Sequence, residues 1–215
     1  MLLAHGSTFS RKGASGKFGA VQNGRIALAE SVCSEFFDDD RLVRAANMFD
    51  HLPDYAIPAK AALEPALAKA REDAMSAFRA LPQSLERDQA LAALGRLGQP
   101  SMKSRAKHRA AIVRAACGNR LEEIEWVIGH AIDCRNKYVH GAEGKFDYDR
   151  YPSSVYFLVT TLEFVYCVSD LIECGWDMNP WREAGTSLSH PFARYLQDYP
   201  RRLRALREVL GGGGN

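Results

Sequence analysis

The chain of 215 residues lacks the features that mark several large classes of protein. Its five cysteines, at positions 33, 117, 134, 167 and 174, include no Cys-x-x-Cys pair. The odd number and the wide spacing favour buried thiols in a reducing cytoplasm over a disulfide framework. No uninterrupted apolar run reaches roughly 18 residues, so no transmembrane helix is expected. The apolar start at residues 1–4 is too short for the core of a signal peptide.

An excess of charge of one sign is also missing. The chain has 28 Lys and Arg against 26 Asp and Glu, and the formal net charge is +2. This charge is too small to indicate a nucleic-acid-binding protein by itself. The apolar share of 47% and the charged share of 25% are typical of an ordinary globular protein. The length suits one domain with a sizeable core.

Apolar residues recur at helical spacing through most of the chain. Residues 1–24 are rich in Gly, Ser and Lys and are expected to be a flexible leader or linker, residues 25–210 a single helical domain, and residues 211–215 a flexible tail. Helices are expected over 26–37, 41–51, 59–80 with an interruption at Pro65, 84–97, 101–117, 121–139, 153–173 and 195–210. The helix over 153–173 is apolar nearly all round, so it should be a central buried helix or a dimer helix. No convincing strand pattern occurs, and the prediction is an all-α bundle of about six to eight helices.

The segment 133–141, with the sequence DCRNKYVHG, carries the most informative pattern. Arg135 lies within the apolar stripe of its helix, which at about 100° per residue contains Leu121, Ile124, Ile128, Ile132 and Val139. Burying a guanidinium there is unfavourable unless an anion meets it. That anion is either an internal carboxylate, such as Glu163 or Asp170, or a substrate. In the first case the motif is structural, and His140 caps the helix.

RNA cleavage without a metal needs a base for the 2′ proton, a cation for the phosphorane and an acid for the leaving 5′ oxygen, and histidine and arginine can supply these groups. RNA carries its own nucleophile, the 2′-hydroxyl; histidine serves as base or acid, and arginine stabilises charge on phosphorus. Asn136 adds an amide that can fix the arginine or a phosphate oxygen. In an unbroken helix Arg135 and His140 point about 140° apart. They are therefore expected to meet only if the helix loosens near residues 139–141, or if two chains meet at a two-fold axis, which favours a homodimer.

The pattern Arg135-Asn136-x-x-x-His140, followed by Gly141 and preceded by a long amphipathic helix, resembles the R-N-x-x-x-H signature of the HEPN superfamily. Residues 41–174 most resemble its Apea-like branch. The resemblance implies a helical, usually dimeric protein and, in many members, a metal-independent endoribonuclease of toxin, antiviral or abortive-infection systems. It implies catalysis by Arg135, Asn136 and His140, without cofactor or metal. Related proteins often carry a further sensing domain, so a sensing domain or regulatory partner protein is also expected.

One departure concerns regulation. Some toxin members have a tyrosine two residues after the histidine, but this chain has Ala142 there. Regulation through modification of that tyrosine is therefore not expected.

A basic segment precedes the motif and contains no acidic residue. It could track RNA phosphates or simply be a solvated helix face. The predicted RNA-binding residues are Lys103, Arg105, Lys107, Arg109, Arg114 and Lys137. Trp126, about opposite Arg135 on its helix, could stack a base, although a helix contact is the usual role of such a residue. His130 and Cys134 lie one turn apart, but no third and fourth metal ligand is evident, so no metal site is predicted.

The sequence thus predicts a cytoplasmic HEPN endoribonuclease that cleaves RNA at a composite site in a homodimer, away from membranes. The alternative is a non-catalytic HEPN-like module that binds a protein or a nucleotide. A DNA-binding regulator is less favoured, because no helix-turn-helix spacing stands out.

Overall fold

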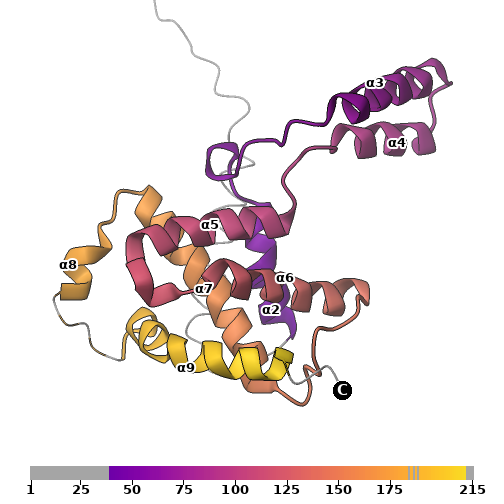
Figure 1. Cartoon of the computed structure of the whole chain (residues 1–215). Coiled ribbons are helices and arrows are strands. Elements are labelled where there is room, and N and C mark those ends of the chain that lie inside the picture. Colours follow the sequence, from indigo (N-terminus) through magenta and orange to yellow (C-terminus); the bar gives the residue numbers. More distant parts are fainter. Residues whose placement is uncertain (1–38, 184, 186, 188, 212–215) are drawn as a thin grey trace, which may run out of the picture.

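The computed structural model describes residues 39–183, 185, 187 and 189–211 (Figure 1). The leader predicted over 1–24, the helix predicted over 26–37, Cys33 and the tail beyond residue 211 lie outside these residues. The described part contains eight α-helices and three short 3₁₀ helices, and no strand. The all-α prediction is confirmed. The elements are α2 (Asp39–Asn47), η1 (Met48–Asp50), η2 (Asp54–Ala56), α3 (Pro65–Ala80), α4 (Leu85–Gly95), α5 (Met102–Cys117), η3 (Gly118–Leu121), α6 (Ile124–His140), α7 (Pro152–Glu173), α8 (Met178–Glu183) and α9 (Pro191–Gly211).

Helix α7 is the centre of the bundle. It packs against α5, α6, α2 and α9, and it buries side chains on nearly every side. Among them are Leu158, Leu162 and Val165, none of which is exposed to solvent. The helix is long and apolar enough to cross a membrane, but most of it is covered by its neighbours in the bundle. The prediction of a central buried helix is confirmed.

Local signals define several helix ends. The Ser84 and Ser101 side chains accept hydrogen bonds from the backbone N–H of Arg87 and Ser104, as expected for N-caps. Gly141 ends α6 in the left-handed conformation, with φ +66°, and donates its N–H to the carbonyl of Lys137. The predicted helix over 59–80, with an interruption at Pro65, is not observed. Pro65 is the first residue of α3, because proline lacks the N–H that a helix interior needs but a first turn does not.

The C-terminal region differs from the sequence prediction in two places. The short helix α8 was not predicted, and α9 begins at Pro191 rather than 195. Helix α9 also continues through Pro200. Its packing against α7 and η3 buries Tyr195, Tyr199 and Leu203, so tertiary contacts outweigh the local preference of proline.

Helices α3 and α4 form a hairpin that projects from the bundle (Figure 1). Neither helix has a buried residue. The hairpin is held together by two arginines that donate to backbone carbonyls of the opposite helix: Arg71 to Leu94 at 2.8 Å and Arg87 to Phe78 at 3.0 Å. Its two ends meet where the N–H of Ala61 donates to the carbonyl of Gly98 at 3.0 Å.

Candidate active site

The predicted motif residues gather around one guanidinium group at the C-terminal end of α6. Arg135 Nη1 lies 2.9 Å from His140 Nε2 and donates to Asn136 Oδ1 at 3.2 Å. Arg135 Nη2 donates to Asn47 Oδ1, on α2, at 2.9 Å. Because a guanidinium can only donate, His140 Nε2 is the acceptor in this arrangement. His140 then carries its ring proton on Nδ1, and Nε2 has a lone pair that could take a proton from a substrate.

The meeting of Arg135 and His140 within one chain corrects the geometric prediction. Helix α6 continues unbroken to His140, yet the two side chains are in contact. The angle of about 140° describes where the side chains leave the helix, not where their ends lie. The long arginine side chain reaches around the helix end, because His140 is the last helical residue and Gly141 turns the backbone away. One chain therefore supplies both groups, and the motif no longer requires a second copy to bring them together.

Arg135 has no carboxylate partner among the described residues. Glu163, one predicted partner, binds Arg41 instead through two hydrogen bonds of 2.8 Å, and both side chains are nearly fully buried. Asp170, the other predicted partner, makes no ion pair with Arg135. Arg135 Nε is buried and has no hydrogen-bond acceptor among the residues that the structure describes. The internal ion pair of the structural interpretation is therefore wrong, and the guanidinium is half-buried beside the three polar side chains of Asn47, Asn136 and His140.

Sequence reasoning missed Asn47. This residue is the last of α2 and lies 88 positions before Arg135. Nothing in the local sequence distinguishes it from other polar residues near a helix end. Only the packing of α2 against α6 brings its amide to the guanidinium, where it fixes the orientation of the group from outside the motif.

Neither the thiol nor the phenol on the adjacent face of α6 is ionised at neutral pH. Burial raises the pKa of Cys134 to about 12 and that of Tyr138 to about 12. Within the described residues, no group of three or more His, Cys, Asp or Glu side chains could hold a metal ion.

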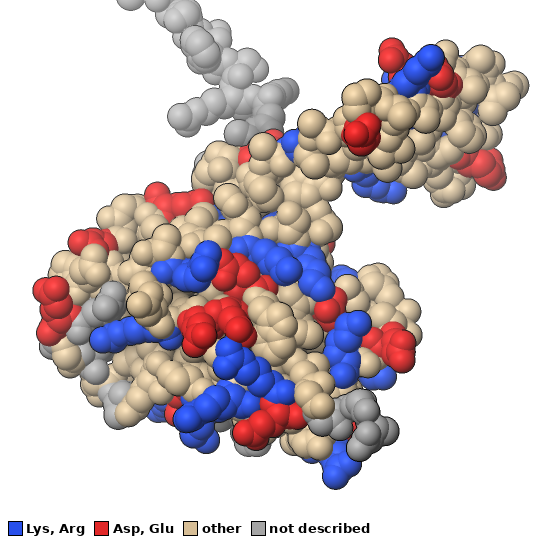
Figure 2. Space-filling view, in the orientation of Figure 1, with Lys and Arg blue, Asp and Glu red and all other residues tan. Residues whose placement is uncertain are grey.

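Most residues of the basic segment pair with acidic residues from elsewhere in the fold. Lys103 pairs with Asp133 at 2.8 Å, Arg105 with Asp50 at 3.6 Å, and Arg114 with Glu125 at 2.9 Å. Figure 2 shows the result on one face, where Lys and Arg gather in bands over α5 and α9 with Asp and Glu between them. The segment itself contains no acidic residue, but acidic residues from other parts of the fold compensate most of its charges.

Arg109 must be removed from the predicted RNA-binding residues. Its side chain is fully buried, donates to Ser169 Oγ at 2.8 Å and forms an ion pair with Glu173. It therefore ties α5 to α7 inside the bundle. The remaining two predicted residues, Lys107 and Lys137, are exposed, and no carboxylate in the described ranges lies within ion-pair distance of either.

The region that contains these residues matches a known protein family. The family profile described as Apea-like HEPN matches residues 45–180, which is more than half of the chain. The chain belongs to the Apea-like HEPN family. The matched range contains Asn47, Arg135, Asn136 and His140, and HEPN domains are commonly nucleases. No curated protein and no solved structure matches the chain.

Proposed function

We propose that this HEPN domain is a metal-independent endoribonuclease. The observation that carries the proposal is the contact of 2.9 Å between His140 Nε2 and a guanidinium without a carboxylate partner in the described residues. A base and a fixed cation beside each other are the groups that attack by a 2′-hydroxyl requires.

The proposed reaction is an attack of RNA on itself. A phosphate oxygen replaces His140 as a partner of Arg135, which frees Nε2 to take the 2′ proton. The 2′ oxygen then bonds to phosphorus, and the bond from phosphorus to the 5′ oxygen breaks. The leaving oxygen takes a proton from an acid, so the products carry a 2′,3′-cyclic phosphate and a 5′-hydroxyl. Arg135 stabilises the charge on the phosphorane, while Asn136 and Asn47 hold the guanidinium in place.

The proposal includes a homodimer, cytoplasmic location and a role in toxin, antiviral or abortive-infection defence. A single His140 serves as base, and a second copy of the site could supply the acid for the leaving oxygen. A sensing domain or regulatory partner protein would then control activity. No cofactor takes part in the reaction. Each of these properties goes beyond what membership of the family alone implies.

The second candidate function is a non-catalytic HEPN module that binds a protein or a nucleotide. The observation that favours it is the hydrogen bond from Arg135 to Asn47, because this bond also joins α6 to α2. In that case the guanidinium would stabilise the fold and would not act on a phosphate.

The test compares cleavage and stability in the same variants. His140→Ala should lower cleavage of single-stranded RNA by at least about 100-fold. Arg135→Ala should also abolish cleavage. The melting temperature of both should stay close to that of the parent, because each loses only partly solvated hydrogen bonds. His51→Ala, which removes an exposed histidine outside the motif, is the matched control and should cleave normally.

Two further measurements test the mechanism. Cleavage should continue in EDTA, and a substrate with a single 2′-deoxy nucleotide at the cleaved position should resist it. A requirement for magnesium, or equal cleavage of the 2′-deoxy substrate, would refute the mechanism. Folded variants that cleave like the parent, or variants that fail to fold, would favour the non-catalytic module.

A further inference from the structure

The outer face of α6, opposite Arg135, is crossed by lysine side chains from neighbouring elements. A Cβ atom placed on Gly129 would lie 3.1 Å from Cε of Lys107 and 3.2 Å from Cε of Lys103. The absence of a side chain at this position is what lets both lysines of α5 lie across α6. Near the end of the helix, a Cβ on Gly144 would lie 3.1 Å from Cδ of Lys137. Gly129 on α6 thus accommodates two lysine side chains of α5, and Gly144 in the loop after α6 accommodates Lys137.

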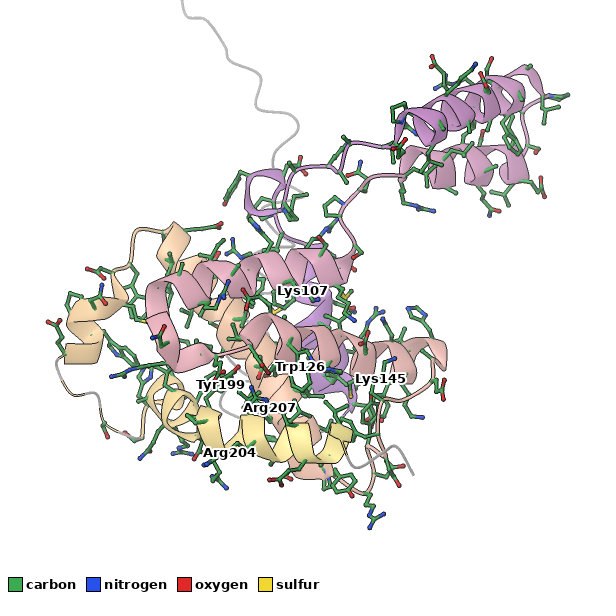
Figure 3. All side chains as sticks on the ribbon, in the orientation of Figure 1. Lys107, Trp126, Lys145, Tyr199, Arg204 and Arg207 are labelled. Atoms are coloured by element: carbon green, nitrogen blue, oxygen red, sulfur yellow. The ribbon has the colours of Figure 1, made fainter. Side chains whose placement is uncertain are left out.

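Two aromatic rings of α6 lie near the lysines that cross it. Trp126 and His130 are one turn apart on α6, and their ring centroids are 4.4 Å apart at an angle of 72°. Trp126 is only partly buried. Figure 3 shows it on the same face as Lys107 and Lys145, with Lys107 on the α5 side and Lys145 on the segment that follows α6.

The charge around His130 is positive. Burial lowers the pKa of His130; Asp133 opposes this shift, and Lys103, Lys145 and Lys107 add to it. Asp133 is itself bound to Lys103. In the described ranges, Lys107, Lys137 and Lys145 have no carboxylate within ion-pair distance, whereas Arg207, on the α9 side of Trp126, pairs with Glu123 at 2.8 Å. We call Lys107, Trp126, Lys145 and Lys137 the α6 strip.

The α6 strip leads toward the active site. From Gly129 to Lys137 the helix rises roughly 12 Å, and His140 follows within one further turn. A stacked strand advances roughly 3.4 Å per nucleotide, so the strip spans several phosphates. Its cations are separated along the helix, which suits a chain of phosphates, and its aromatic ring suits a base.

We propose that the α6 strip binds a single-stranded RNA segment, with its phosphates on Lys107, Lys145 and Lys137 and one base against Trp126, and directs it to His140. The proposal adds a binding surface to the nuclease function, and it rests on that function for the cleavage of the bound strand. Binding can nevertheless be measured when no cleavage occurs.

The experiment uses His140→Ala as a non-cleaving parent and a labelled oligouridine roughly 10 to 15 nucleotides long. Replacing Lys107 and Lys145 by glutamine should weaken binding at least about tenfold and reduce the slope of log K against log salt by about 1.4, since each lost phosphate contact contributes about 0.7. The matched control replaces Lys60 and Lys69, two exposed lysines far from the strip in the sequence. It should bind within about twofold of the parent.

Two single substitutions test the other parts of the strip. Trp126→Leu keeps an apolar side chain but removes the stacking surface, and should weaken binding at least about fivefold. Gly129→Ala adds a methyl group against both lysine side chains, and should weaken binding while the helix is retained, because alanine favours helix more than glycine does. Circular dichroism confirms that each variant is folded.

The outcomes separate this proposal from the proposed function. Folded strip variants that bind like the parent would overturn the strip, even if the wild-type chain cleaves RNA. Loss of binding in the strip variants alone supports the strip, even if the wild-type chain cleaves nothing. Equal loss in the Lys60 and Lys69 control would show general charge attraction and overturn the proposal. Competition by polyglutamate but not by a second RNA would identify an acidic protein partner and overturn it as well.

Discussion

The bundle and the α3–α4 hairpin are built from helices of similar length, but only the bundle buries side chains. Helices α3 and α5 each have 16 residues. Helix α5 buries five of them, whereas α3 buries none. Helical conformation in this protein therefore does not depend on burial in the core. The difference teaches that a local sequence sufficient to make a helix says little about where the helix lies.

The two regions are stabilised in different ways. Hairpin helices are rich in alanine and charged residues, which favour helix, and are joined by arginine side chains that bind backbone carbonyls. Isolated helices of this length are marginal in water. The bundle instead encloses apolar side chains and two arginines whose charges are met internally, Arg41 by Glu163 and Arg109 by Glu173. Mutations should therefore affect the bundle far more than the hairpin.

The largest effect is expected from Glu163→Ala in the bundle. The substitution removes the carboxylate that binds buried Arg41 through two hydrogen bonds, and should lower the free energy of unfolding by about 3 to 5 kcal/mol in urea denaturation. Glu72→Ala, an exposed carboxylate of the hairpin, is the control and should change it by less than about 0.5 kcal/mol. A loss below about 1 kcal/mol for Glu163→Ala would show that the other groups around Arg41, or water, compensate for the lost carboxylate.

The next effect compares one leucine from each region. Leu162→Ala in α7 opens a cavity in the core and should cost about 2 to 5 kcal/mol of stability. Leu91→Ala in α4 removes a partly exposed side chain and should cost less than about 1 kcal/mol. Thermal or urea unfolding of both variants tests the difference. Equal losses would mean that the hairpin and the bundle unfold as one cooperative unit.

A smaller effect concerns pH and is confined to the bundle. Because burial lowers the pKa of His130 in the folded state, the unfolded chain binds a proton more readily there. Stability should fall as the pH drops below about 6.5, the pKa of an exposed histidine. His130→Gln should reduce this fall, measured as the difference in unfolding free energy between neutral and acidic pH. If the pH dependence of stability is unchanged in His130→Gln, groups other than His130 cause the acid sensitivity. The hairpin cannot contribute through a histidine, because residues 62–97 contain none.

The smallest effect is expected when the hairpin is removed altogether. Ala61 and Gly98 are joined by a hydrogen bond of 3.0 Å, so a short Gly-Ser linker can replace residues 62–97. The melting temperature of the shortened chain should stay within a few degrees of the parent, because no buried side chain of α3 or α4 is lost. Failure of the shortened chain to fold would show that the hairpin stabilises the bundle.

Several features could be predicted from sequence because their causes are local. The caps at Ser84, Ser101 and Gly141 depend on backbone groups only a few residues away. The burial of α7 follows from an apolar surface on every side of one helix. The placement of Arg135 in an apolar stripe is also a property of one helix.

Other features were decided by tertiary structure, because they depend on which distant residues meet. Arg109 looked like one more surface cation, but the packing of α5 on α7 places it in the core. The partner of Glu163 is Arg41 and not Arg135, a choice made across 122 positions of sequence. Asn47 reaches Arg135 only because α2 crosses α6.

The sequence by itself therefore determined most of the helices, several of their ends and the motif, since these follow from periodicity and from contacts within one or two turns. Only the tertiary structure decided which charges are paired inside the fold and which lie on its surface. The reason is physical: a buried charge is stable only beside its counter-charge, and the fold brings the two together from distant parts of the chain.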